Sequence, residues 1–162
     1  MSMKRLIIHW TAGSHTPSSV DREHYHFIVA GNGAVVKGDH RVDDNLSTAD
    51  GVYAAHTRGC NGGAIGVAMA GMLSAQGPGK LGKYPLIKVQ WDACMALVKK
   101  LCKDYKIPIT PSTVLSHAEV QGTLGIKQNG KIDISFGVPN KPNLRTAKAC
   151  GDFIRETISK KE

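Results

Sequence analysis

Short apolar runs separated by polar, glycine-rich loops fill the first half of the chain and predict β-strands. Residues 4–10 (KRLIIHW) predict a short buried strand whose side chains alternate between two faces. Residues 25–37 predict a β-hairpin, because Asn32-Gly33 tolerates positive φ between two apolar segments. Residues 64–70 (AIGVAMA) form an apolar run bounded by glycines, which is typical of a central strand.

Helical periodicity replaces this pattern in the second half. Residues 85–106 predict a helix that ends before Pro108, and residues 143–160 predict a C-terminal helix with Asn143 as its N-cap. The expected core stripes are Val89, Ala93, Ala96, Leu97 and Leu101 in the first helix, and Ala147, Cys150, Phe153, Ile154 and Ile158 in the second. Residues 113–116 predict a short strand between them. Strands and helices mixed in this way favour an α/β fold with a mixed central β-sheet flanked by helices.

The composition of the 162-residue chain, with 41% hydrophobic residues, is that of a globular protein and excludes wholesale disorder. The length predicts a single domain over residues 1–162. No stretch approaches the roughly 18–20 apolar residues of a spanning helix, so we expect no stable membrane insertion. The first apolar run ends at His9 without a cleavage site, which predicts synthesis in the cytoplasm without a signal peptide. The cysteines, none in a CxxC pair, are expected to be reduced and buried: Cys60, Cys94, Cys102 and Cys150.

The net charge of +8 favours anionic partners. The basic residues are scattered, however, and the densest group, Lys99, Lys100 and Lys103, lies on a predicted helix without any nucleic-acid-binding motif. We therefore expect no nucleic-acid partner. The charge still allows electrostatic contact with an anionic cell envelope.

Two of the seven histidines, His9 and His117, stand at the ends of predicted apolar strands. Rigid elements often present functional side chains at such ends. A catalytic zinc site needs about three protein ligands with N, O or S donors and one open position. Two strand-end histidines and one carboxylate would meet this requirement.

Asp133 is the candidate carboxylate, shortly after the predicted turn at Asn129-Gly130. Residues two apart in an extended chain face the same side, so Lys131 would point into the same cleft, where it can stabilise a developing oxyanion. The pattern KxD is also common in surface ion pairs. The other carboxylates considered are Asp21, Glu23, Asp39, Asp43, Asp44, Asp50 and Glu119.

Five segments follow one another in a recognisable order: HWTAG at 9–13, YHFIV at 25–29, AAHTRGCNGGAIGVAMAG at 54–71, His117, and KID at 131–133. In this order they resemble the motifs of the zinc-dependent N-acetylmuramoyl-L-alanine amidases. That family includes amidase-type phage lysozymes, cell-wall-recycling amidases and peptidoglycan recognition proteins. Each motif alone is weak, whereas the ordered combination, over roughly residues 4–160, is specific.

The resemblance implies a ligand set and an activity. His9, His117 and Asp133 would bind Zn²⁺, and Lys131 would hold the oxyanion. The implied reaction is zinc-dependent hydrolysis of the amide bond between N-acetylmuramic acid and L-alanine in peptidoglycan. A phage or prophage endolysin, acting on the cell wall after release, fits this reading.

Two further roles are implied by position. Tyr25 matches the tyrosine beside the catalytic water in the phage lysozymes, and His56 matches a histidine of the substrate cleft. The chain departs from the cell-wall-recycling members, which carry a general-base glutamate in the strand where Ala68 and Ala70 stand here. It also has Asp133-Ile-Ser where many members continue Asp-Pro-Gly. The alternative is a non-catalytic peptidoglycan-binding module of the same fold.

Overall fold

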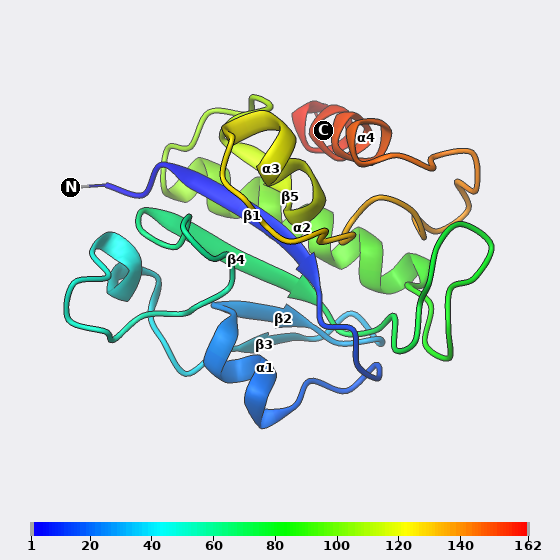
Figure 1. Ribbon diagram of the computed structural model, residues 1–162, viewed down its shortest axis with the longest axis horizontal. Helices are drawn as coiled ribbons and strands as arrows, with labels where there is room; N and C mark the ends of the chain where they lie inside the picture. Colours follow the sequence, from blue (N-terminus) through cyan, green and yellow to red (C-terminus); the bar gives the residue numbers. More distant parts are fainter. Residues whose placement is uncertain (1, 162) are drawn as a thin grey trace.

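A five-stranded β-sheet forms the centre of the protein, and the computed structural model describes residues 2–161 around it (Figure 1). The strands are β1 (Arg5–Trp10), β2 (Phe27–Val29), β3 (Val35–Lys37), β4 (Ala64–Met69) and β5 (Val114–Ser116). Their order in the sheet is β3-β2-β4-β1-β5. Only the β2–β3 hairpin is antiparallel among these described strands, because β1 pairs in parallel with β4 and β5, and β2 with β4. The predicted mixed sheet is confirmed.

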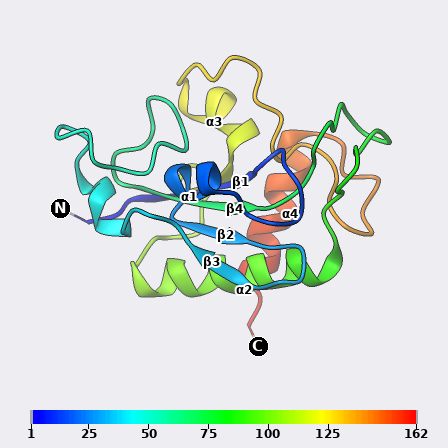
Figure 2. The ribbon, with the colours of Figure 1, turned by 90° about the horizontal axis from the view of Figure 1, so that it is seen from below.

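Helices cover both faces of this sheet. They are α1 (Ser19–His24), α2 (Lys88–Asp104), α3 (His117–Leu124) and α4 (Ala147–Ser159), with a 3₁₀ turn, η1 (Val42–Leu46). Figure 2 shows α2 and α4 side by side under one face, and α1, α3 and long loops on the other. The predicted α/β arrangement, a central sheet flanked by helices, is therefore confirmed.

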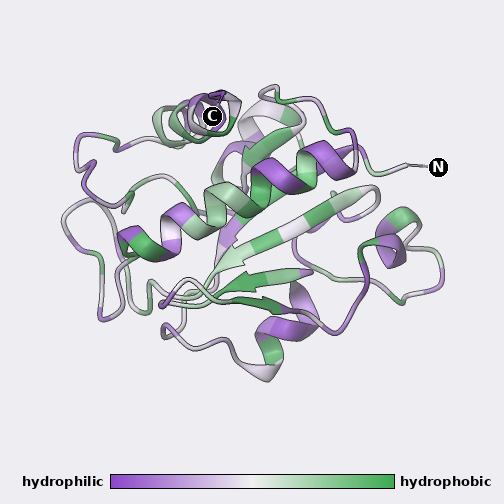
Figure 3. Cartoon of the chain, turned by 180° about the vertical axis from the view of Figure 1, so that it is seen from behind, coloured by the Kyte–Doolittle hydropathy of each residue, from purple (hydrophilic) through white to green (hydrophobic). Residues whose placement is uncertain are grey.

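The alternation along β1 divides its side chains between the two faces. Leu6, Ile8 and Trp10 belong to the main core with α2 and α4. Ile7 belongs to a smaller cluster under α3, and His9 follows it on that side. In Figure 3 the strands are mainly hydrophobic, whereas α1 is mainly hydrophilic. The α3 side of the sheet has only this smaller apolar cluster, so polar side chains such as His9 can be placed there without interrupting the main core.

Small residues of β4 make room on the same face. A side chain at Gly66 would bring its Cβ within 2.4 Å of the His56 ring, so only glycine allows that ring to lie on the sheet. Ala68 and Ala70 leave space that Tyr25 fills. The strand therefore provides a shallow floor, on which larger polar residues from the loops are seated.

The strands predicted at 4–10, 64–70 and 113–116 and the hairpin at 25–37 are confirmed. One detail is wrong: β2 begins at Phe27, and Tyr25 lies before it as the C-terminal cap of α1. The helix over Ser19–His24 was not expected from the sequence. Its capping box between Ser18 and Asp21 is the local signal for it.

The predicted helix at 85–106 exists, and its apolar stripe is partly right: Leu101 is buried and Ala93 and Leu97 pack against the main core, whereas Ala96 is exposed. Val89 is 54% exposed, and the buried face is Gln90, Trp91, Cys94, Met95, Val98, Leu101 and Cys102. Gln90 explains why α2 is turned about its axis relative to the predicted stripe. Its side-chain amide donates to the carbonyls of Val29 and Ala70 at 3.0 and 2.7 Å, which holds this face against the sheet. Two sheet carbonyls thus select which face of α2 turns inward.

The C-terminal helix is shorter than predicted. Its N-cap is Thr146, whose hydroxyl accepts from the Ala149 N–H at 3.1 Å, and not Asn143. The buried positions of α4 are Cys150, Gly151, Ile154, Arg155 and Ile158. The helix α3 was also missed, although it begins at His117. All four cysteines are free and buried, as expected.

Among the described residues, no helix combines the length and apolar character that crossing a membrane requires.

Candidate metal centre

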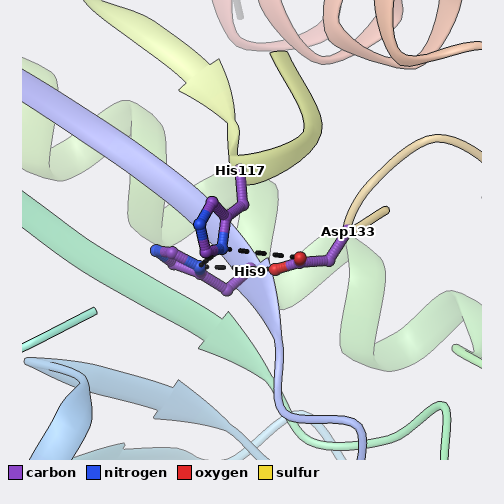
Figure 4. A group of neighbouring side chains, drawn as sticks. All are labelled: His9, His117 and Asp133. Carbon is purple, nitrogen blue, oxygen red and sulfur yellow. Dashed lines mark hydrogen bonds and ion pairs between the residues drawn. The ribbon is translucent and has the colours of Figure 1, made fainter. Parts of the chain in front are cut away.

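Three side chains from distant parts of the chain form a triangle of donor atoms on the α3 side of the sheet (Figure 4). His9 Nδ1 lies 3.1 Å from His117 Nδ1 and 3.3 Å from Asp133 Oδ2. His117 Nδ1 lies 3.5 Å from Asp133 Oδ1. All three residues are buried, with exposed fractions of 0%, 6% and 7%. The structure thus brings together the three predicted ligands.

The sheet topology accounts for this meeting. β1 and β5 are parallel neighbours, so their carboxyl ends lie at one edge, where His9 ends one strand and His117 follows the other. Asp133 arrives on a loop. Its carbonyl accepts from the Ala118 N–H at 2.6 Å, which ties the loop to the first turn of α3. The pairing of β1 with β5 thus sets the distance between His9 and His117, and the bond to α3 brings Asp133 beside them.

The charges of the triangle suit a cation. Burial lowers the pKa of His9 to about 4, so its ring is neutral at pH 7. Burial raises the pKa of Asp133, but its interactions with the side chains of His117 and His9 outweigh burial and leave the pKa below the usual value. The site therefore offers neutral imidazole and an ionised carboxylate.

These donors fit zinc in kind and spacing. Zinc bonds to such N and O ligands measure about 2.0–2.2 Å, and a tetrahedral ion then separates its ligand atoms by about 3.3–3.6 Å. The observed separations of 3.1–3.5 Å agree to within a few tenths of an ångström. When both rings carry their proton on Nε2, the two Nδ1 lone pairs point at the space between them, where a cation can accept both. The residues present fit a zinc ion.

A cleft of about 500 Å³ opens beside the triangle. Lys131 is exposed at its rim, two residues before the buried Asp133, and both line the cleft as the KxD spacing predicts. An adjoining cavity of about 430 Å³ shares its lining at Ala55, His56, His117, Asn129 and Lys131. The two cavities therefore adjoin at Lys131.

Tyr25 packs beside the first ligand. Its ring centroid lies 5.1 Å from that of His9, and it covers Ala68 and Ala70. Burial raises the pKa of Tyr25, and the carboxylates of Asp133 and Asp21 add to the effect. The phenol is therefore protonated at neutral pH and offers an O–H to the cleft.

His56 lies behind His9, and only 6% of it is exposed. Its Nδ1 is 3.2 Å from His9 Nε2, and its Nε2 is 3.1 Å from the Ala64 carbonyl. Both ring nitrogens thus have protein partners. Substrate contact by His56, expected from the resemblance, stays a prediction.

Two neighbours of the ligands escaped the sequence analysis. Gln128 Oε1 lies 2.7 Å from His117 Nε2, and Thr57 Oγ1 lies 3.3 Å from His9 Nε2. Thr57 follows His56 in the motif AAHTRG and could have been suspected there. Gln128 stands in a loop without pattern, so no local signal marks it.

The other histidines have separate partners. His26 is buried between Asn45 and the Gly66 backbone. His24 ends α1 and lines the cleft. Its Nδ1 bonds the Ala55 carbonyl at 3.0 Å.

Comparison with known proteins identifies the family. The family model described as N-acetylmuramoyl-L-alanine amidase matches residues 1–133, most of the chain. The chain belongs to this amidase family. All three residues of the donor triangle lie within the matched segment. A search of curated proteins found no match.

Solved structures share the fold of this amidase-family chain at low sequence identity. The Ph2119 endolysin from the Thermus scotoductus MAT2119 bacteriophage Ph2119 is 20% identical, with a TM-score of 0.53, and 76% of each chain is covered. The amidase AmiD from E. coli, solved with an anhydro-N-acetylmuramic acid peptide substrate, is 20% identical with a TM-score of 0.51. That match covers 72% of this chain and 48% of AmiD. Bumblebee PGRP-SA is 16% identical with a TM-score of 0.50, covering 76% and 75% of the two chains.

Proposed function

We propose that the protein is a zinc-dependent N-acetylmuramoyl-L-alanine amidase, which hydrolyses the bond between N-acetylmuramic acid and L-alanine in peptidoglycan. Membership of the amidase family supports the reaction. The triangle of His9, His117 and Asp133 is the observation that carries the metal dependence, because its donors have the type, charge and spacing that zinc requires.

The residues of the triangle would hold the ion, each through one donor atom. Bound zinc supplies a Lewis acid, which polarises the scissile carbonyl and lowers the pKa of a water from about 15.7 to about 7. The cleft beside the triangle leaves one side open to substrate and solvent. The cleft and the adjoining cavity provide room on both sides of the scissile bond.

Lys131 and Tyr25 would act on the substrate from the cleft. The Lys131 ammonium can stabilise the carbonyl oxygen as negative charge develops on it. The protonated phenol of Tyr25 can donate a hydrogen bond to that oxygen or a proton to the departing nitrogen. Ala68 and Ala70 provide no carboxylate on β4, so proton transfer would depend on such cleft groups.

We also propose that residues 1–162 form one catalytic domain, of the kind that serves as a phage or prophage endolysin. A single sheet with one main core over the described residues supports one domain. The endolysin Ph2119 is a fold neighbour of comparable extent, which supports the cell-wall role. The basic charge is compatible with an anionic wall as partner.

Mass spectrometry of digested peptidoglycan tests the proposal. Purified walls treated with the zinc-loaded protein should yield free L-alanine amino ends and intact glycan chains, and a chelator should stop the release. Products cut in the glycan or between amino acids would overturn the assignment. Binding to walls without cleavage, with zinc present, would instead favour the non-catalytic module.

A further inference from the structure

The first ligand, His9, is held on the side that faces away from the donor triangle. Its Nδ1 faces Asp133 and His117, whereas its Nε2 lies 3.2 Å from His56 Nδ1 and 3.3 Å from Thr57 Oγ1. A neutral imidazole carries one proton, on either nitrogen. Only a ring with its proton on Nε2 presents a lone pair to a metal from Nδ1.

His56 decides that tautomer. Its Nε2 lies 3.1 Å from the Ala64 carbonyl, which can only accept, so the His56 proton is on Nε2. His56 Nδ1 is then an acceptor and faces His9 Nε2, which must donate. The Thr57 hydroxyl, 2.8 Å from His56 Nδ1 and 3.3 Å from His9 Nε2, can donate to the former and accept from the latter, which also requires the His9 proton on Nε2. The proton of His9 is thereby kept on Nε2.

The His56 ring is fixed in place. It lies on Gly66, where a Cβ would clash at 2.4 Å. The backbone N–H groups of His56 and Thr57 both donate to Asn61 Oδ1, at 2.9 and 2.8 Å. Because the backbone and both ring nitrogens of His56 have partners, its Nδ1 stays in one position relative to His9 Nε2.

The second ligand has an equivalent support of different chemistry. His117 Nε2 lies 2.7 Å from Gln128 Oε1, while the Gln128 amide nitrogen donates to the Arg58 carbonyl at 2.6 Å. The latter bond sets the orientation of the amide, so an oxygen faces His117. His117 must then donate through Nε2, which leaves Nδ1 for the triangle.

We propose that His56 and Gln128 are positioning residues that hold His9 and His117 in the tautomer and ring orientation needed to bind a metal through Nδ1. This inference rests on the proposed metal centre and deepens it. It assigns to His56 a role toward the ligand in place of the expected substrate contact. Such outer partners typically contribute a factor of about 10–100 in metal affinity.

Two variants at each position distinguish the loss of the hydrogen-bond acceptor of His56 or Gln128 from a change in packing alone. His56→Asn keeps an acceptor oxygen near the place of Nδ1, whereas His56→Leu has similar volume and no acceptor. Gln128→Glu keeps the acceptor, and Gln128→Met removes it. We expect the zinc Kd, measured by chelator competition, to rise about 10–100-fold in the Leu and Met variants and to recover largely in Asn and Glu. Unchanged zinc Kd in both Leu and Met variants would overturn the proposal.

His26→Leu is the matched control. His26 is also a buried histidine with both ring nitrogens bonded, but its partners are Asn45 and Gly66. It should lower the stability without changing the zinc Kd of the folded protein. An equal rise of the Kd in this control would mean that any buried defect loosens the site, and would also overturn the proposal.

Further measurements distinguish a positioning role of His56 from substrate contact and from a failure of zinc binding itself. In ¹⁵N-histidine spectra, His9 and His117 of the zinc-loaded protein should give slowly exchanging Nε2–H signals, and His56→Leu should speed the exchange of the His9 proton. If His56 contacts substrate instead, its Leu variant will raise KM at saturating zinc and leave the zinc Kd unchanged. If the wild-type protein binds no zinc, the proposed function itself fails.

Discussion

Tyr25 lies at the cleft as a protonated phenol next to His9, with no carboxylate on the strand beneath it. Tyr25→Phe removes only the hydroxyl and keeps the packing. We expect unchanged zinc content and a kcat lower by about 10²–10⁴, the usual range for a general acid–base group. Steady-state kinetics with metal analysis checks this. Full activity would direct attention to His24, which also lines the cleft.

Lys131 is exposed at the rim, so its contribution should be to charge and not to folding. Lys131→Ala should keep zinc and lose about 10²–10³ in kcat, the effect of removing one oxyanion donor. Lys131→Arg should restore only part of the rate, because a planar guanidinium replaces a compact charge. Lys80→Ala, an exposed lysine that lines neither cavity, is the control. Equal turnover of the Lys131 and Lys80 variants would contradict the assignment.

His26 should make the metal-free protein sensitive to mild acid. Burial lowers its pKa to about 4, whereas an unfolded histidine titrates near 6.5. Between these values His26 is protonated in the unfolded chain and neutral in the folded chain. The free energy of unfolding therefore falls as pH falls from about 6.5 to 4. Each such group contributes a slope of roughly 1.4 kcal/mol per pH unit.

Urea unfolding of wild type and His26→Gln across this pH range, with a chelator in every sample, measures the effect. The variant should show a slope smaller by about that amount. His9 contributes its own part in both proteins and cancels from the comparison. Identical slopes would show that His26 is protonated in the folded state.

At the scale of the elements, a buried ion pair joins α4 to α3, the helix that begins with His117. Arg155 meets both oxygens of Glu119, at 3.2 and 2.9 Å, and also donates to the Val114 carbonyl. Glu119 in turn accepts from the Ser116 N–H at 2.9 Å. A Cβ at position 151 would lie 2.0 Å from Glu119, so a glycine of α4 permits this approach. The pair therefore sets the position of the first turn of α3.

Removing one partner should cost more than removing both. Glu119→Leu leaves the buried guanidinium with only the half-exposed carboxylate of Asp152, at 2.9 Å, and is expected to lower the free energy of unfolding by up to about 3–5 kcal/mol. Glu119→Leu with Arg155→Met should recover much of this loss, because two apolar groups replace both charges. Urea unfolding of wild type, Glu119→Leu, Arg155→Met and the double variant gives the double-mutant cycle that measures this. A double variant less stable than Glu119→Leu alone would count against a buried pair.

For the whole molecule, zinc should bind the folded chain only, since its three ligands are distant in sequence and meet through the sheet. Zinc at 100 times its Kd should then raise the free energy of unfolding by about 2.7 kcal/mol. Thermal unfolding with zinc, with chelator and with magnesium measures this. His9→Ala and His117→Ala should remain folded and lose the shift. A zinc shift that persists in both variants would place the metal elsewhere.

The sequence by itself determined the elements that local periodicity encodes. The runs at 4–10 and 64–70 are short and mainly apolar, as buried strands are, and Asn32-Gly33 marks the hairpin turn, so these strands could be predicted. His9, His117 and Asp133 were candidates because strand ends and turns are recognisable in a single chain. Their residue types also determined the kind of chemistry that the site can support.

The tertiary structure alone decided what depends on contacts between distant segments. The rotation of α2 follows from Gln90 reaching two sheet carbonyls, which outweighs the Val89 stripe that the sequence favours. Pairing of β1 with β5 sets the distance between His9 and His117. The partner of His117, Gln128, comes from a loop without periodicity. Periodicity records only which face of an element is apolar, whereas ring tautomers and ligand distances depend on where other elements place their donors and acceptors.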